Sequence, residues 1–162
     1  MSLATDPEFL SSCADRRDRH GEVDRSIACS TCGFALWIPI ASLEVSDVGL
    51  YNDARFPGRL LVSLREHHDH LDEVPDTESA AFLRDVRLCS AVLRRSLGAL
   101  RVNFAILGNQ EPHVHAHLIP RNPRDEPLPS HAPWQDPRPR MDMPSPQCGQ
   151  ILDRLTAALA SA

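Results

Sequence analysis

The sequence predicts an α+β fold, in which a mostly antiparallel sheet of about five strands carries one long helix packed on it. Short apolar runs of strand length occupy residues 34–50, 60–64, 101–107 and 113–119. A single long stretch, residues 76–98, instead repeats its apolar side chains at three- and four-residue steps. The chain has 162 residues, which is enough for one domain to bury about two-thirds of the surface of its unfolded chain.

The first apolar segment, residues 34–50, is broken by Pro39 and Gly49, which suits short strands joined by turns. A turn-rich stretch with Pro57-Gly58 follows, and it precedes the run at 60–64. That run is short and bounded by turn residues, so it predicts a buried strand and not a helix.

The long helix is predicted over Asp76 to about Gly98. Asp76 or Thr77 is expected to cap its start, and Gly98 to end it. One face should hold the recurring apolar residues, which are Phe82, Leu83, Val86, Cys89, Val92, Leu93 and Leu97.

The strands at 101–107 and 113–119 are separated only by the loop 108–112, so they should form a hairpin. The chain is then expected to divide into a partly ordered N-terminal arm at 1–26, a central domain at 27–125 and a tail. The tail, residues 126–162, is rich in proline and should end in a short helix over Gln150–Ala160.

Composition excludes several classes of function. The formal net charge is −5, and no basic footprint stands out beyond the arginines between Arg16 and Arg25, which argues against nucleic acid as the main partner. No run of 18 apolar residues predicts a membrane span, and no apolar signal-peptide core is seen, so a cytoplasmic protein is expected. An odd number of cysteines then indicates free thiols or metal ligands: Cys13, Cys29, Cys32, Cys89 and Cys148.

Three histidines alternate along the last predicted strand. Because successive strand side chains point to opposite faces, His113, His115 and His117 should line one face at spacings of about 7 Å. Such a row of imidazoles, which titrate near neutrality, can attack, protonate and bind a phosphate. His-x-His pairs on strands also present metal ligands, so the spacing alone leaves both interpretations open. The opposite face carries Val114, Ala116 and Leu118.

Residues 112–121 resemble the signature of the histidine-triad (HIT) family, His-φ-His-φ-His-φ-φ with φ apolar. The similarity extends upstream to 52–57 and 102–109 and downstream to 133–134, where the chain looks like bacterial diadenosine tetraphosphate hydrolase-like members. It therefore runs from about residue 29 to residue 134. This resemblance implies the HIT-like form of the α+β fold, and a homodimer formed through the long helix and a neighbouring strand.

The resemblance also implies a nucleotide hydrolase or nucleotidyl transferase that acts on dinucleoside polyphosphates or nucleoside phosphoramidates. His115 would attack the α-phosphorus and form a nucleotidyl-histidine that water then cleaves. His117 would hold a phosphate oxygen, and the backbone carbonyl of His113 or His115 could fix the tautomer of the attacking ring. Asn109 and Gln110 are placed to donate hydrogen bonds to the developing charge.

Two departures from the family pattern affect the substrate site. Arg59 stands where the family commonly has a fourth histidine; an arginine would bind phosphate oxygens but cannot act as a general acid near neutral pH. Asn52 or Asp53 lies where the family places its partner for the ribose hydroxyls, but the spacing is one residue short of the family pattern. The alternatives are a surface role for Arg59 and simple turn chemistry for the other two.

Cys29 and Cys32 form a Cys-x-x-Cys pair that can share one tetrahedral zinc. By the resemblance, His67 and His113 would complete a structural zinc site, and no organic cofactor is implied. Absence of any metal is a further possibility. Another possible ligand set is an N-terminal knuckle of Cys13, His20, Cys29 and Cys32.

Two other classes of function remain open at this stage. One is a non-catalytic nucleotide-binding HIT module, and the other is a metal-dependent hydrolase that uses the histidine triad as ligands. Covalent labelling of His115 distinguishes the nucleotidyl hydrolase from the non-catalytic module. The response of activity to chelators distinguishes it from the metal-dependent hydrolase.

Overall fold

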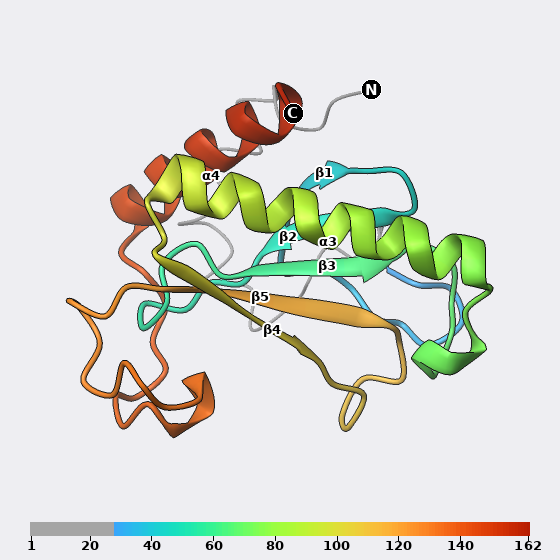
Figure 1. The fold of residues 1–162 in the computed structure, drawn as a ribbon, viewed down its shortest axis with the longest axis horizontal. Helices are drawn as coiled ribbons and strands as arrows, with labels where there is room; N and C mark the ends of the chain where they lie inside the picture. The colour runs from blue at the N-terminus through green and yellow to red at the C-terminus, as the bar shows by residue number, and fades with distance from the viewer. Residues whose placement is uncertain (1–27) are drawn as a thin grey trace.

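The computed structural model describes residues 28–162, so the predicted N-terminal arm lies outside the described residues. They form a five-stranded antiparallel sheet in the order β1-β2-β3-β5-β4, with α3 lying across one face (Figure 1). The predicted α+β class and its five-stranded sheet are confirmed. The strands are β1 Ile38–Ser42, β2 Ser46–Leu50, β3 Leu60–Leu64, β4 Arg101–Ile106 and β5 His115–Arg121.

The histidine-bearing strand β5 lies inside the sheet, between β3 and β4. Ser63 of β3 is opposite His115, and Ala105 of β4 is opposite His117. The predicted hairpin of β4 and β5 is present. The predicted start of the strand at His113 is wrong, however, because β5 begins at His115. Val114 still pairs locally, as its carbonyl accepts the Leu64 N–H.

Helix α3 spans Asp76–Leu97 and ends at Gly98, whose φ of 70° is left-handed, as predicted. The predicted N-cap is wrong: Pro75 occupies that position, and no side-chain cap bond forms. The ring of Pro75 holds its φ near a helix-compatible value, so the helix starts without a side-chain cap bond. Leu83 is also an exception on the predicted apolar face, since it is 48% exposed.

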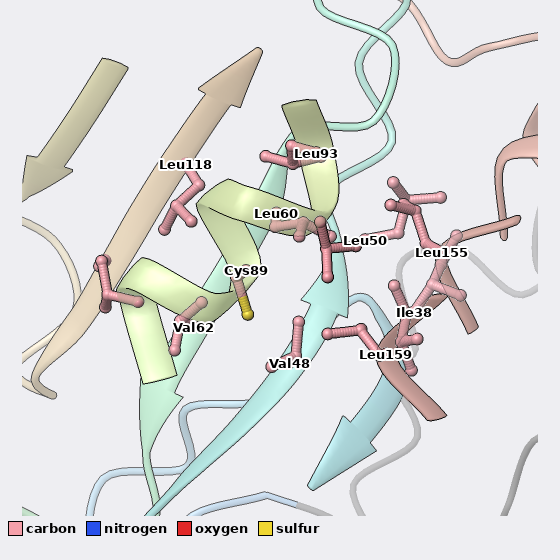
Figure 2. Close-up of a cluster of buried hydrophobic side chains, with 14 of the residues drawn as sticks. Ile38, Val48, Leu50, Leu60, Val62, Cys89, Leu93, Leu118, Leu155 and Leu159 are labelled. Atoms are coloured by element: carbon pink, nitrogen blue, oxygen red, sulfur yellow. The ribbon is translucent and has the colours of Figure 1, made fainter. Parts of the chain in front are cut away.

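A second helix, α4 at Ser145–Ala160, begins five residues before the predicted Gln150. Proline is tolerated in the first helical turn, where its missing N–H has no partner to lose, so the Pro-rich composition concealed this start. Figure 2 shows Leu155 and Leu159 of α4 in the same cluster as Cys89 and Leu93 of α3 and the apolar face of the sheet. The tail thus contributes to the core of the domain.

Two short 3-10 turns complete the described structure, η3 at Leu71–Glu73 before α3 and η4 at Pro133–Gln135. Within residues 28–162, no helix is both long and apolar enough to cross a membrane.

Candidate active site and metal centre

The histidine triad lies on the face of the sheet opposite the helices. Its apolar neighbours Val114 and Leu118 are buried in the core cluster under α3. His113 and His115 are themselves only 3% and 4% exposed, and His117 is half-buried. The alternation predicted from the sequence therefore places the imidazoles together, although the first of them precedes the strand.

Phe34 joins the first two histidines into one stack. Its ring centroid lies 4.9 Å from that of His113 and 4.9 Å from that of His115, close to parallel in both cases. The His117 ring meets His115 edge-on at 5.0 Å. Phe34 thus limits the rotation of the two rings that it contacts.

His115 has a defined hydrogen-bond partner for one ring nitrogen. Its Nδ1 donates to the backbone carbonyl of His113 at 2.7 Å, which leaves the lone pair on Nε2. Burial lowers the pKa of His115, and the bond to the His113 carbonyl only partly opposes this. The ring is therefore neutral and nucleophilic at neutral pH.

Arg59 is not a surface side chain, since only 15% of it is exposed. Its guanidinium lies over the Tyr51 ring, 4.1 Å from the centroid, and Nη2 approaches His117 Nδ1 to 3.0 Å. Its Nη1 donates to Asp53 at 3.3 Å. Burial, then the positive charge of Arg59 and then His115 lower the pKa of His117 to about 3.

A pocket of about 530 Å³ opens over these groups. His115 and His117 line it, together with Arg59 and the predicted donors Asn109 and Gln110. Residues that the sequence analysis did not single out also line it: Phe34, Trp37, Tyr51 and Leu61. The ring of Trp37 stacks on Tyr51 at 4.4 Å, so aromatic surface is available beside the histidines.

The structure does not bring Asn52 or Asp53 into this pocket. Asp53 is fully buried and accepts hydrogen bonds from the Arg55 and Arg59 guanidinium groups. Burial alone would raise its pKa, but the bonds from Arg55 outweigh burial and lower it. The Oδ1 atom of Asn52 accepts the Met143 N–H at 2.9 Å.

Four predicted metal ligands lie together at the other end of the triad. One ligand atom from each of Cys29, Cys32, His67 and His113 lies within 4.8 Å of the others. The Cys29 Sγ–His67 Nδ1 distance is 3.6 Å, and both the Cys32 Sγ–His113 Nδ1 and the His67 Nδ1–His113 Nδ1 distances are 3.4 Å. Tetrahedral zinc, with bonds of about 2.0–2.3 Å, needs donor atoms roughly 3.3–3.8 Å apart.

The contacts of the other ring nitrogens of His67 and His113 favour a cation at the centre of this cluster. His113 Nε2 donates to the Leu64 carbonyl at 2.8 Å, and His67 Nε2 contacts the Asp69 carboxylate at 2.9 Å. Each Nδ1 then carries a lone pair, and two facing lone pairs repel unless a cation lies between them. Outer carboxylate and carbonyl partners of this kind orient histidines that bind metals.

Of the triad, only His113 belongs to the cluster within the described residues, and His115 and His117 stay outside it. Burial would raise the pKa of the Cys29 thiol, but backbone hydrogen bonds at Cys32 and Thr31 outweigh it and lower the pKa to about 7. The alternative knuckle with Cys13 and His20 lies outside the described residues.

Comparison with known proteins identifies sequences related to this chain. The sequence profile of the HIT domain matches residues 43–124. A curated, uncharacterized HIT-like protein of Methanocaldococcus jannaschii is 32% identical over 71 residues, which cover 41% of this chain. The match spans about half, 55%, of the length of that relative.

Solved structures share the fold. A histidine triad protein from Sinorhizobium meliloti has a TM-score of 0.66 at 24% identity, covering 74% of this chain and 87% of its own. A zinc-bound histidine triad family protein from Mycobacterium smegmatis has a TM-score of 0.59 at 25% identity, covering 84% and 96%. A diadenosine triphosphate hydrolase from Plasmodium falciparum has a TM-score of 0.52 at 15% identity, covering 76% of each chain.

Proposed function

This chain belongs to the HIT domain family, and on that premise we propose that it cleaves nucleotides at the α-phosphate through a covalent nucleotidyl-His115. In the first step, His115 Nε2 forms a bond to the α-phosphorus, and the bond to the leaving group breaks: a phosphate departs as an anion, and an amine takes up one proton from the solvent. In the second step, water attacks the phosphorus, the P–N bond breaks, and the nucleotide and a proton are released. Dinucleoside polyphosphates and nucleoside phosphoramidates both present such a phosphate.

The observation that carries this proposal is the hydrogen bond from His115 Nδ1 to the His113 carbonyl. It fixes the tautomer in which Nε2 bears the lone pair, in a pocket of about 530 Å³ that this ring lines. Splitting one displacement into two is the usual gain of nucleophilic catalysis.

Other residues of the pocket have supporting roles in this proposal. His117 binds a non-bridging phosphoryl oxygen beside the nucleophile. Asn109 and Gln110, which line the pocket, donate hydrogen bonds to the charge that develops on the phosphate or leaving group. Arg59 adds a positive charge next to His117.

Substitution of the nucleophile tests the reaction. We expect His115→Ala to abolish turnover of diadenosine polyphosphates and of a nucleoside phosphoramidate, while nucleotide binding by calorimetry survives. An acid-labile protein adduct should form with radiolabelled substrate in the wild type and be absent in the variant. His131→Ala, which removes an exposed histidine, is the matched control and should retain full activity.

Two outcomes would redirect the proposal. Binding without turnover or adduct would indicate a nucleotide-binding module. Activity that survives in His115→Ala but needs added metal would indicate a metal-dependent hydrolase with the triad as ligands. The separation of His115 and His117 from the Cys/His cluster argues against that second function.

We further propose that Cys29, Cys32, His67 and His113 hold a structural zinc ion. The donor set and its spacing fit tetrahedral zinc, and a relative with the same fold is zinc-bound. A bound ion would tie the segment before β1 to the start of β5 and leave His115 free to attack.

Elemental analysis of protein purified without an affinity metal tests this site. We expect a zinc content near one per chain, reduced strongly by His67→Ala. A content near zero in the wild type contradicts the site. A content near one that survives both His67→Ala and His113→Ala would instead support the set with Cys13 and His20.

A further inference from the structure

One charged side chain in the pocket makes contacts beyond those that phosphate binding requires. Arg59 is held by Asp53 on one side and meets His117 on the other. We propose that Arg59 is a positioning residue that fixes the proton of His117 on Nε2, so that His117 serves as a neutral hydrogen-bond donor.

The tautomer follows from the chemistry of the two side chains. A guanidinium has only donors and stays charged, so it cannot accept a bond from a ring N–H. The Nη2–Nδ1 contact of 3.0 Å therefore requires the lone pair of His117 on Nδ1. In a neutral ring the single proton then lies on Nε2.

The arginine itself has little freedom to move away. The Asp53 carboxylate is fully buried and accepts from Nη1, while the Tyr51 ring lies under the guanidinium at 4.1 Å. Buried ion pairs with further hydrogen bonds of this kind are costly to separate. The chain Asp53–Arg59–His117 thus connects a buried anion to the pocket.

Two groups next to His117 disfavour a second proton on its ring. Arg59 is a cation in direct contact, and His115 on the same strand is a second imidazole at 5.0 Å between centroids. Tyr51 presents an edge-on ring at 6.2 Å. Glu111 lines the same pocket, and its negative charge favours a proton on the imidazoles. Burial, Arg59 and His115 outweigh this effect and lower the pKa of His117 to about 3.

This inference rests on the proposed function only for its consequence. During transfer at the α-phosphate, the Nε2–H of His117 would donate to a phosphoryl oxygen, and the positive charge would come from Arg59. A fourth histidine at this position would titrate near neutrality, whereas an arginine keeps its charge over the whole working range.

Long-range ¹H–¹⁵N correlation spectra of protein labelled at its eight histidines test the tautomer without any substrate. His117 is assigned by comparison with His117→Gln. We expect a protonated Nε2 and a bare Nδ1, unchanged down to about pH 4 in the wild type. In Arg59→Met, the tautomers should mix, and the midpoint of titration should rise by roughly 1 to 3 pH units as the cation is lost.

Matched variants make the result specific. Arg59→Lys keeps the charge and a donor, so it should restore most of the wild-type behaviour. Arg140→Met removes another arginine of the same aromatic stack, 4.4 Å from the Trp37 ring, and should leave the His117 signals unchanged. If Arg59→Met does not fold, the wild-type and Arg59→Lys spectra still decide the question.

A wild-type His117 that is protonated on Nδ1, or that titrates near its ordinary pKa, overturns the inference, as does an Arg59→Met spectrum like the wild type. The expected tautomer in a protein without hydrolase activity would contradict the proposed function alone.

Discussion

At the scale of single residues, the polar side chains beside the pocket already have partners in the protein. Both oxygens of Asp53 accept from arginines, and Asn52 Oδ1 accepts the Met143 N–H. A sugar hydroxyl that replaced one of these bonds would gain little, because one charged or polar contact would be lost for each one made. We therefore expect that these two residues do not recognise the ribose of a nucleotide bound in the proposed site.

This arrangement predicts that the protein accepts 2′-deoxynucleotide substrates. A hydrogen bond from a hydroxyl to a charged carboxylate is typically worth about 1.5–3 kcal/mol, or roughly ten- to a hundredfold in kcat/KM. We expect matched ribo and deoxyribo substrates to differ by less than about threefold in kcat/KM. Discrimination above about tenfold, reduced by Asp53→Asn, would show that Asp53 leaves Arg55 to bind the sugar.

The sequence alone predicted those site residues that form a recognisable motif. Strict alternation placed His113, His115 and His117 on one face, and the Cys-x-x-Cys spacing of Cys29 and Cys32 indicated ligands. It did not find Phe34, Trp37 or Tyr51. Single aromatics next to short apolar runs look like core residues, and only the folded structure shows that these rings, which flank β1 and β2, stack beside the histidines.

At the scale of elements, the turn before β3 is packed tightly against the end of α3. Gly58 has a φ of 93°, and a Cβ there would lie 2.2 Å from Leu97 Cδ1. Gly98 has a similar positive φ of 70°, but a Cβ there would meet nothing within 4 Å. Substitutions at the two glycines therefore distinguish the cost of backbone strain from the cost of a close contact.

We predict that Gly98→Ala costs about 1–2 kcal/mol, the penalty for a left-handed residue with a side chain. Gly58→Ala should cost roughly 1–3 kcal/mol more, because the added methyl displaces Leu97. Urea unfolding of each variant measures these values. Combining Gly58→Ala with Leu97→Ala should cost at least about 1 kcal/mol less than the sum of the single changes, since the clash disappears. Simple additivity would contradict the contact.

The bounds of a helix or strand were predictable where a regular repeat of apolar residues marks them, and less so where no such repeat does. The apolar period of α3 gave its length and its glycine end. The start of β5 was misplaced at His113, since alternation continues through residues that lie outside the ladder. The start of α4 was misplaced because prolines suit both a loop and a first helical turn.

At the scale of the whole molecule, one edge of the sheet is available to pair with another chain. Strand β4 is the last in the order β1-β2-β3-β5-β4. Phe104 and Ile106 on it are 53% and 40% exposed, and Leu100 just before it is 60% exposed. At the opposite edge, α4 packs against β1, as Figure 1 shows. An unpaired edge strand with apolar side chains is a template for another chain.

We therefore propose that two copies of this chain associate through β4 and the adjoining surface of α3, the homodimer that the sequence implied by resemblance. Sedimentation velocity at micromolar concentration should give the mass of two chains, twice 18.0 kDa. Phe104→Glu would bury an unpaired charge in this interface and should shift the protein to monomers while its fold persists. Met141→Glu changes another exposed apolar residue, which is 64% exposed and lies away from β4 in the chain, so it should leave the dimer intact. A wild-type monomer contradicts the dimer itself. A dimer that survives Phe104→Glu would place the interface elsewhere, and the exposed edge of β4 would then need another explanation.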